Sequence, residues 1–257
     1  MSTPNDTATH DSALKGILVA GMVAFVCALV VSLAAVTLRP YQDANLAAER
    51  QSRVTAIIEG IPGLGHLAQT GVARALVLAL GTDRVDASVD PETLDLVAQL
   101  KDDTQSIALP PADDIAGLKR RENHQVLYAI ENADGGVAAL ILPVRGLGYA
   151  SMLKGYLAVA GDGRTIQGLE FYEHGETPGL GARIDDPAWK AKWVGKQAFD
   201  SDGRLVIEVV KGQAQTDAQV DGITGATRTG EGINNTVRFW LGPLGFGPYL
   251  ARLREGG

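Results

Sequence analysis

The chain has 257 residues, 23 basic and 30 acidic side chains, a net charge of −7 and one cysteine. This length is enough for one large or two modest domains, and a hydrophobic content of 46% fits neither a disordered tail nor a polytopic membrane protein. The acidic balance argues against a nucleic-acid binder, and the lone Cys27 excludes an intrachain disulfide framework and a multi-thiolate metal or iron–sulfur site.

An uncharged apolar segment lies near the N-terminus. Residues 16–38 follow a polar tail, residues 1–15, and end before Arg39. Because about 20 apolar residues span the hydrocarbon core of a bilayer, the segment is long enough for a transmembrane helix. The alternative is a cleaved signal peptide, since Ser32-Leu33-Ala34 fits a small-x-small cleavage site. The length of the segment and the weakly basic tail before it favour an uncleaved anchor.

The rest of the chain predicts a helical neck followed by a mixed, largely antiparallel α+β domain. Apolar residues at helical spacing predict a helix over 41–60 and a short one around residues 94–100. Residues 39–120 are assigned to the neck and the first part of the soluble domain, and residues 121–257 to the α+β domain.

Strands are predicted within the α+β domain from runs of apolar and β-branched residues. The first two lie on either side of the Ala133-Asp134-Gly135-Gly136 turn. The predicted strands are 124–130, 137–144, 155–160, 165–172 and 204–210. A helix is predicted over 230–241, where apolar residues fall on one face.

One motif resembles a dinucleotide-binding fingerprint. Residues 63–68 match G-x-G-x-x-A, with Asp83 following at a suitable distance. The fingerprint requires a preceding strand, whereas here a predicted helix and Pro62 come before it. Helix-terminating glycines are the better interpretation.

A glycine-rich loop follows the strand predicted over 165–172. Residues 174–181 read HGETPGLG, in which Pro178 fixes one dihedral angle and Gly179 and Gly181 permit positive φ. The backbone can therefore approach a ligand closely, and its free amides suit a carbonyl-rich ring. An ordinary strand-to-helix loop fits equally well. His174 and Glu176 lack a third ligand, so we interpret them as surface polar groups and predict no metal site.

A second candidate segment, residues 221–229, leads into the last predicted helix. It reads DGITGATRT, and Thr227 or Thr229 is a candidate N-cap. The amino end of a helix favours a phosphate group, although the segment lacks the Gly-Lys-Ser/Thr of a Walker loop. A plain capped helix remains an alternative on composition alone.

The string Asp-x-x-Thr-Gly-Ala-Thr over residues 221–227 resembles the covalent-flavinylation motif of the sodium-translocating NADH:quinone reductase and related electron-transport complexes. The tail over residues 239–257, FWLGPLGFGPYLARLREGG, is similar to that of the covalent-FMN subunit of the sodium pump, as is the Glu-Thr-Pro-Gly-Leu-Gly loop. The single apolar segment and the overall length fit the same family.

This resemblance implies that FMN is the cofactor and that a flavin transferase joins its phosphate to Thr227 by a phosphoester bond. Asp221 and Gly222 would belong to the pattern that the transferase recognises. The loop would cradle the isoalloxazine ring. The residues implied at the FMN site are Thr177, Gly179, Leu180, Gly181, Thr224, Gly225, Ala226 and Thr227.

The resemblance also implies a function. The chain would relay single electrons from NADH toward ubiquinone within a multi-subunit Na⁺-transporting complex, with no catalytic acid, base or nucleophile of its own. It would be a single-pass protein of a bacterial inner membrane with a periplasmic flavin domain. That placement overrides the charges beside residues 16–38, which weakly favour the cytoplasm.

Two points stay open within this resemblance. The family commonly has a tryptophan near the flavin, whereas this chain has Ala150 at about that position and Tyr149 beside it. Tyr149 is a candidate aromatic contact or an ordinary core residue. The flavin subunit of the ferredoxin-type electron-transport complex and a non-redox anchored binding module remain alternatives, and the tail favours the sodium pump.

Overall fold

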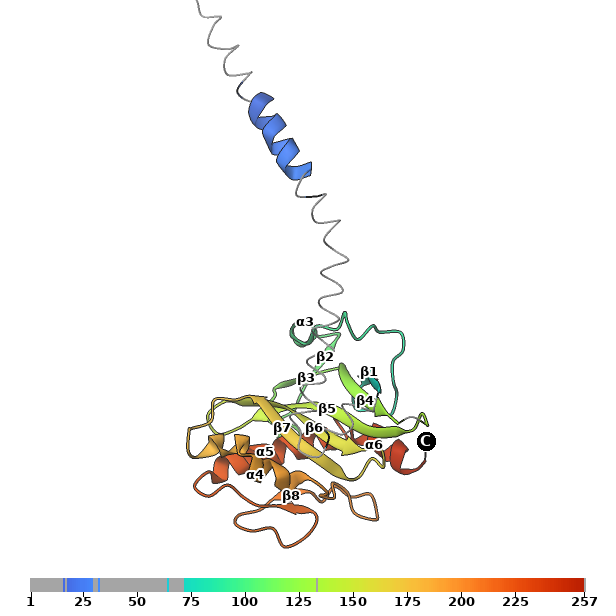
Figure 1. Ribbon diagram of the computed structural model, residues 1–257, viewed down its shortest axis with the longest axis vertical. Coiled ribbons are helices and arrows are strands. Elements are labelled where there is room, and N and C mark those ends of the chain that lie inside the picture. Colours follow the sequence, from blue (N-terminus) through green and yellow to red (C-terminus); the bar gives the residue numbers. More distant parts are fainter. Residues whose placement is uncertain are drawn as a thin grey trace, which may run out of the picture. The chain divides into compact units, whose positions relative to one another are not determined.

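The computed structural model describes residues 16, 18–29, 32, 64, 72–132 and 134–256. The chain divides into two compact units, Met1–Arg53 and Val54–Gly257. In the first unit, residues 18–29 are helical (Figure 1). Among the described residues, no helix is both long and apolar enough to cross a membrane.

Several predictions from the N-terminal part of the chain lie outside the described residues. These are the tail over residues 1–15, much of the apolar segment over 16–38, the helix over 41–60 and most of the fingerprint over 63–68. They stay predictions.

A five-stranded sheet forms the framework of the second unit (Figure 1). Its strands lie in the order β1-β4-β5-β6-β7, and every neighbouring pair is antiparallel. The predicted mixed α+β fold with an antiparallel sheet is therefore confirmed. The strands are β1 (Val72–Ala79), β4 (His124–Glu131), β5 (Val137–Leu147), β6 (Met152–Ala160) and β7 (Ile166–Glu173).

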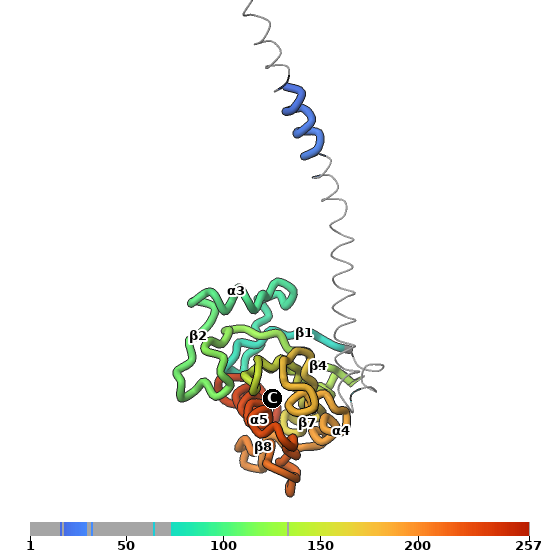
Figure 2. The backbone as a smooth tube through the Cα atoms, turned by 90° about the vertical axis from the view of Figure 1, so that its left-hand side faces the viewer, coloured from blue at the N-terminus to red at the C-terminus, as the bar shows by residue number. Residues whose placement is uncertain are grey.

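Short strands and helices complete this unit. β2 and β3 form an antiparallel pair, and β8 and β9 form a parallel pair. In Figures 1 and 2, α3 and β8 lie at opposite ends of the unit. The elements are α3 (Leu96–Lys101), β2 (Ser106–Ala108), β3 (Arg120–Glu122), η1 (Gly181–Asp185), α4 (Pro187–Lys190), η2 (Ala191–Trp193), β8 (Glu208–Val209), β9 (Gln219–Val220), α5 (Thr227–Leu241) and α6 (Gly247–Arg254).

The predicted strands from β4 to β7 agree with the structure to within a few residues. The strand predicted over 204–210 is too long, because only Glu208 and Val209 form a strand while Leu205 makes an isolated bridge to Phe199. β1 was not predicted, and it pairs with β4 along eight positions. The domain division at residue 120 stays a prediction, although β1 precedes it and belongs to the main sheet.

The last long helix, α5, packs on one face of the sheet. Leu140, Leu142 and Val144 alternate along β5 and are at most 3% exposed, because alternate residues of a strand point to the same face. They belong to one core with Val237 and Trp240 of α5. The Trp240 indole N–H donates a hydrogen bond of 2.7 Å to the carbonyl oxygen of Arg145, which ties the helix to the strand.

α5 also approaches the turn between β5 and β6 very closely. A Cβ at Gly232 would lie 2.5 Å from the carbonyl oxygen of Leu147 and 2.8 Å from Gly148 Cα. Only a glycine fits between these backbones without a shift. The first turns of α5 are thus held beside the end of β5, and this contact positions the candidate site.

Two glycines of α5 provide a matched test of this contact. We expect Gly232→Ala to lower the free energy of unfolding by about 1–3 kcal/mol, because the methyl group overpacks the contact with β5. Gly230→Ala should instead be neutral or stabilising by up to about 1 kcal/mol, since alanine favours a helix. Its Cβ would meet Val209 at an ordinary 3.6 Å. Urea unfolding, monitored by tryptophan fluorescence, measures the free energy of unfolding of both variants. An equal change in the two variants would contradict the proposed close packing at Gly232.

Candidate functional site

The two candidate segments from the sequence meet at one cavity. Its volume is about 410 Å³, within the range of small-molecule sites. The β5–β6 turn contributes Tyr149, and the other walls come from the 174–181 loop and the start of α5. The lining residues are Tyr149, Glu176, Thr177, Leu180, Gly181, Gly225, Ala226, Thr227, Arg228 and Thr229. We call this the smaller cavity.

Six of the eight predicted site residues line the smaller cavity. Gly179 and Thr224 do not. Gly179 forms the bend of the loop with φ +77°, while Thr224 faces a neighbouring cavity. Gly225 has φ +79°, and a Cβ there would lie 3.2 Å from the Leu180 side chain. These left-handed glycines let the loop and the turn before α5 come together.

The two threonines at the start of α5 have different environments. The helix begins at Thr227, and its N-cap, Ala226, makes no side-chain capping bond. The prediction that Thr227 or Thr229 is the N-cap is therefore wrong. Thr229 is 2% exposed, and its hydroxyl donates a 2.6 Å hydrogen bond to Glu176 Oε2, whereas Thr227 is exposed. Of these two hydroxyls, only that of Thr227 is open to a reactant.

Glu176 is buried, at 4% exposure, so its interpretation as a surface polar group is wrong. Its Oε1 accepts hydrogen bonds of 3.0 Å from the backbone amides of Tyr149 and Ala150. His174 instead pairs with Asp185, with Nε2 and Oδ2 2.9 Å apart. Composition does not distinguish these two polar residues, because burial depends on segments distant in the sequence.

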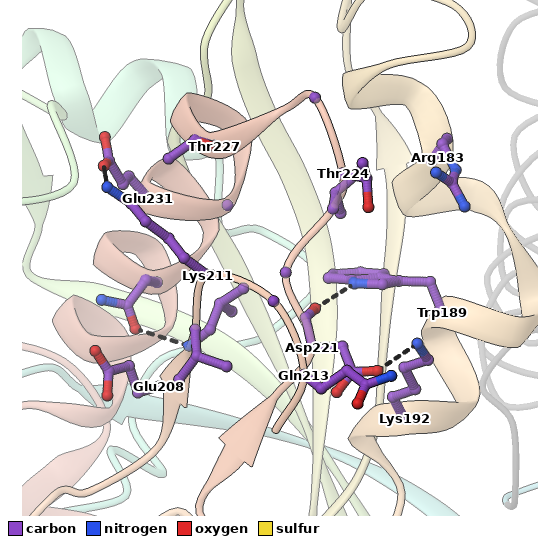
Figure 3. Close-up of a pocket in the computed structure, with 18 of the residues that line it drawn as sticks. Arg183, Trp189, Lys192, Glu208, Lys211, Gln213, Asp221, Thr224, Thr227 and Glu231 are labelled. Atoms are coloured by element: carbon purple, nitrogen blue, oxygen red, sulfur yellow. Dashed lines mark hydrogen bonds and ion pairs between the residues drawn. The ribbon is translucent and has the colours of Figure 1, made fainter. Parts of the chain in front are cut away.

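A larger cavity of about 950 Å³ also borders Thr227. Figure 3 shows Thr227 at the start of α5 and, across the cavity, Arg183, Trp189 and Lys192 from the η1–α4–η2 segment. Several of its lining side chains are charged. The two cavities share Gly225 and Thr227. Thr227, an exposed residue, therefore borders both a smaller cavity with few charged side chains and a larger one with many.

Asp221 holds the turn that leads to Thr227 through hydrogen bonds and an ion pair. Its Oδ1 accepts a 2.7 Å hydrogen bond from the Ala214 amide, and its Oδ2 lies 2.6 Å from Lys192 Nζ. Its carbonyl oxygen accepts a 2.9 Å hydrogen bond from the Trp189 indole (Figure 3). The Ala214 amide, followed by Lys192, lowers the pKa of the Asp221 carboxyl. Within this chain, Asp221 thus holds the motif in place.

This arrangement suits a flat ring joined to an anion. Leu180 and Ala226 offer apolar surface in the smaller cavity, and the backbone of the loop offers polar groups. An anionic group attached at Thr227 would lie at the amino end of the 15-residue helix α5, where the helix dipole favours negative charge.

Known proteins share this architecture. Residues 148–242, which contain both candidate segments, match the family described as FMN-binding domain. The chain is 42% identical to the Na(+)-translocating NADH-quinone reductase C-subunit from Pseudomonas aeruginosa, over 97% of this chain and 99% of that protein. It is 39% identical to the protein of the same name from Yersinia pestis, over 96% of this chain and 95% of that protein. The crystal structure of Shewanella oneidensis NqrC has a TM-score of 0.71 and 30% identity, covering 81% of this chain and 99% of that one.

The lowered pKa of Asp221 predicts a pH dependence. The unfolded chain, with an aspartate pKa of about 3.9, binds this proton more readily than the folded chain. The stabilising contribution is therefore present above about pH 4 and is lost as the pH falls through the lowered folded-state pKa. We expect Asp221→Asn to be less stable than wild type near neutral pH, and the difference to shrink in acid.

Urea unfolding at several pH values measures this difference. Asp202→Asn is the matched control, because its ion pair with Arg204 is largely exposed and contributes little. A difference between wild type and Asp221→Asn that stays constant from neutral to acid pH would contradict the linkage.

Proposed function

Because the chain belongs to the NqrC family of the Na(+)-translocating NADH-quinone reductase, we propose that it is the FMN-carrying electron-transfer subunit of such a complex. The match to the FMN-binding domain supports this function, since it includes every residue that lines the smaller cavity. The complex is a translocase in which NADH is oxidised, quinone is reduced and Na⁺ is transported. This chain contributes an electron carrier, and the other subunits of the complex are its partners.

The position of the exposed residue Thr227 is the main support for a covalent phosphoester bond to FMN. This residue stands at the first position of α5 and borders both cavities, while the hydroxyl two residues later is buried and already bonded to Glu176. A flavin transferase would supply an activated flavin donor. The bond between Thr227 Oγ1 and phosphorus would form as the donor's phosphoanhydride bond breaks. The donor's second phosphate would leave with the rest of the donor, and the hydroxyl would lose its proton.

The residues of the smaller cavity fit the isoalloxazine ring. Leu180 and Ala226 would contact its apolar part, and the exposed Thr177 offers a hydroxyl to its polar edge. Tyr149 lies on the rim with the Arg228 guanidinium 5.5 Å from its ring centre, so it is the available aromatic contact. When bound, FMN accepts and passes on single electrons, and the protein holds it and sets its surroundings.

A single-pass anchor completes the proposal. Within the described part of the N-terminal unit, the helix over residues 18–29 exposes apolar side chains, with Leu18, Met22 and Phe25 each at least 60% exposed. Such a surface suits lipid better than water. We place residues 16–38 in the bacterial inner membrane and the flavin domain in the periplasm.

Thr227→Ala tests the attachment site. After co-expression of the full chain with a flavin transferase, we expect wild type to gain the mass of one FMN less one water, and Thr227→Ala to gain none. Thr227→Ser is the matched control, because it retains a hydroxyl at the same position and should still be modified. Intact-protein mass spectrometry measures the fraction modified. An adduct on Thr227→Ala would refute the site, and no adduct on wild type would refute the covalent cofactor.

A topology reporter tests the placement of the domain. Alkaline phosphatase, fused after the last residue, is active only when exported, so we expect an active fusion. A cytoplasmic reporter such as green fluorescent protein at the same position should be dark when exported by the general secretory route. The reverse pattern would place the domain in the cytoplasm, as the charges beside residues 16–38 suggest.

A further inference from the structure

One buried carboxylate joins the three walls of the smaller cavity. Glu176 belongs to the 174–181 loop, and its Oε1 accepts from the amides of Tyr149 and Ala150 on the β5–β6 turn. Its Oε2 accepts from the Thr229 hydroxyl in the first turn of α5. Three donors from two other segments therefore converge on a side chain that is only 4% exposed and borders the cavity.

The surrounding backbone is shaped to admit this side chain. A Cβ at Gly181 would lie 2.6 Å from both Glu176 Oε2 and Thr229 Oγ1. A Cβ at Gly148 would collide with Glu176 Oε1. Either contact is too close for real atoms, so glycines on two sides make room for the carboxylate and its partner hydroxyl. The burial of Glu176 therefore depends on the β5–β6 turn, the 174–181 loop and α5 together.

We propose that Glu176 is a positioning residue of the flavin site, where its carboxylate fixes the spacing of the cavity walls and keeps a negative charge beside the isoalloxazine ring. The positioning role acts through the Tyr149–Ala150 turn and through Thr229, two residues after the attachment threonine. The charge makes the addition of an electron to the ring less favourable. The inference rests on the proposed function for its second role only.

Hydrogen-bond donors, rather than a cation, compensate the charge of Glu176. Among the described residues, no Lys, Arg or His forms an ion pair with it. Arg228, the basic residue in the cavity lining, is exposed on the rim and stacks on Tyr149. Solvent screens an exposed charge more than a buried one, so the buried carboxylate should dominate the field inside the cavity.

Hydrogen exchange tests the positioning role without cofactor. Glu176→Met keeps the bulk of the side chain but removes its acceptors, so we expect the Tyr149 and Ala150 amides of the flavin-free chain to exchange about tenfold faster or more. Glu176→Gln should leave them close to wild type, because its amide oxygen still accepts both bonds and its NH₂ group can donate to Thr229. Unchanged exchange in Glu176→Met would refute the positioning role.

Redox titration of the flavin-loaded chain tests the charge. Glu176→Gln should shift the one-electron equilibrium toward the reduced form by about tenfold, which corresponds to a midpoint potential about 59 mV more positive. Glu173→Gln is the matched control, because Glu173 is three residues away but exposed and paired with Lys154. The control should leave the potential unchanged.

The outcomes separate this inference from the proposed function. An unchanged potential in Glu176→Gln, or an equal shift in Glu173→Gln, would refute the electrostatic role. If wild type acquires no FMN while Glu176→Met still loosens the turn, the proposed function fails and the positioning role holds. If Glu176→Met does not fold, the comparison of Glu176→Gln with Glu173→Gln still decides the electrostatic role.

Discussion

The close contact between α5 and the end of β5 is the constraint on which the site depends. Gly232 lets the helix backbone approach Leu147 and Gly148, and Trp240 ties the helix to Arg145 further along. Because a helix is rigid over this distance, the contact also determines where its first turn lies. Thr227 and the 174–181 loop are thereby brought to the same cavity from positions about 50 residues apart in sequence.

Burial then gives neighbouring residues of one type different roles. Thr227 and Thr229 have the same hydroxyl and lie in the same helical turn, but one faces solvent and the other faces Glu176. A buried hydroxyl that donates to a carboxylate stabilises the fold and is closed to a transferase. The same logic separates Glu176 from Glu173, since the first is enclosed by the cavity walls and the second is paired with Lys154 on the surface.

These contrasts explain what could be predicted from the sequence. The antiparallel strands β4 to β7 could be predicted because their apolar runs are bounded by turn residues. The family could be predicted because its motifs are continuous stretches of sequence. The threonine of the motif was identified by resemblance, and its role stays a prediction. The N-cap prediction is wrong because the helix already includes Thr227 and because the Thr229 hydroxyl donates to Glu176, which is distant in sequence. The burial of Glu176 likewise depends on contacts with distant segments. β1 was not predicted, although it pairs with β4, which lies about 50 residues later.

The shape of the smaller cavity gives a physical reason for the covalent attachment that we propose. Small-molecule sites that hold a ligand without a bond usually bury most of its surface. Here Tyr149, Thr177 and Leu180 on the rim are themselves exposed, so a ring in this cavity would keep one side open. An open ring is accessible to an electron-transfer partner but is held by less contact area. The bond that we propose at Thr227 would hold the ring at a high effective concentration beside its cavity and would leave its exposed side free for the partner.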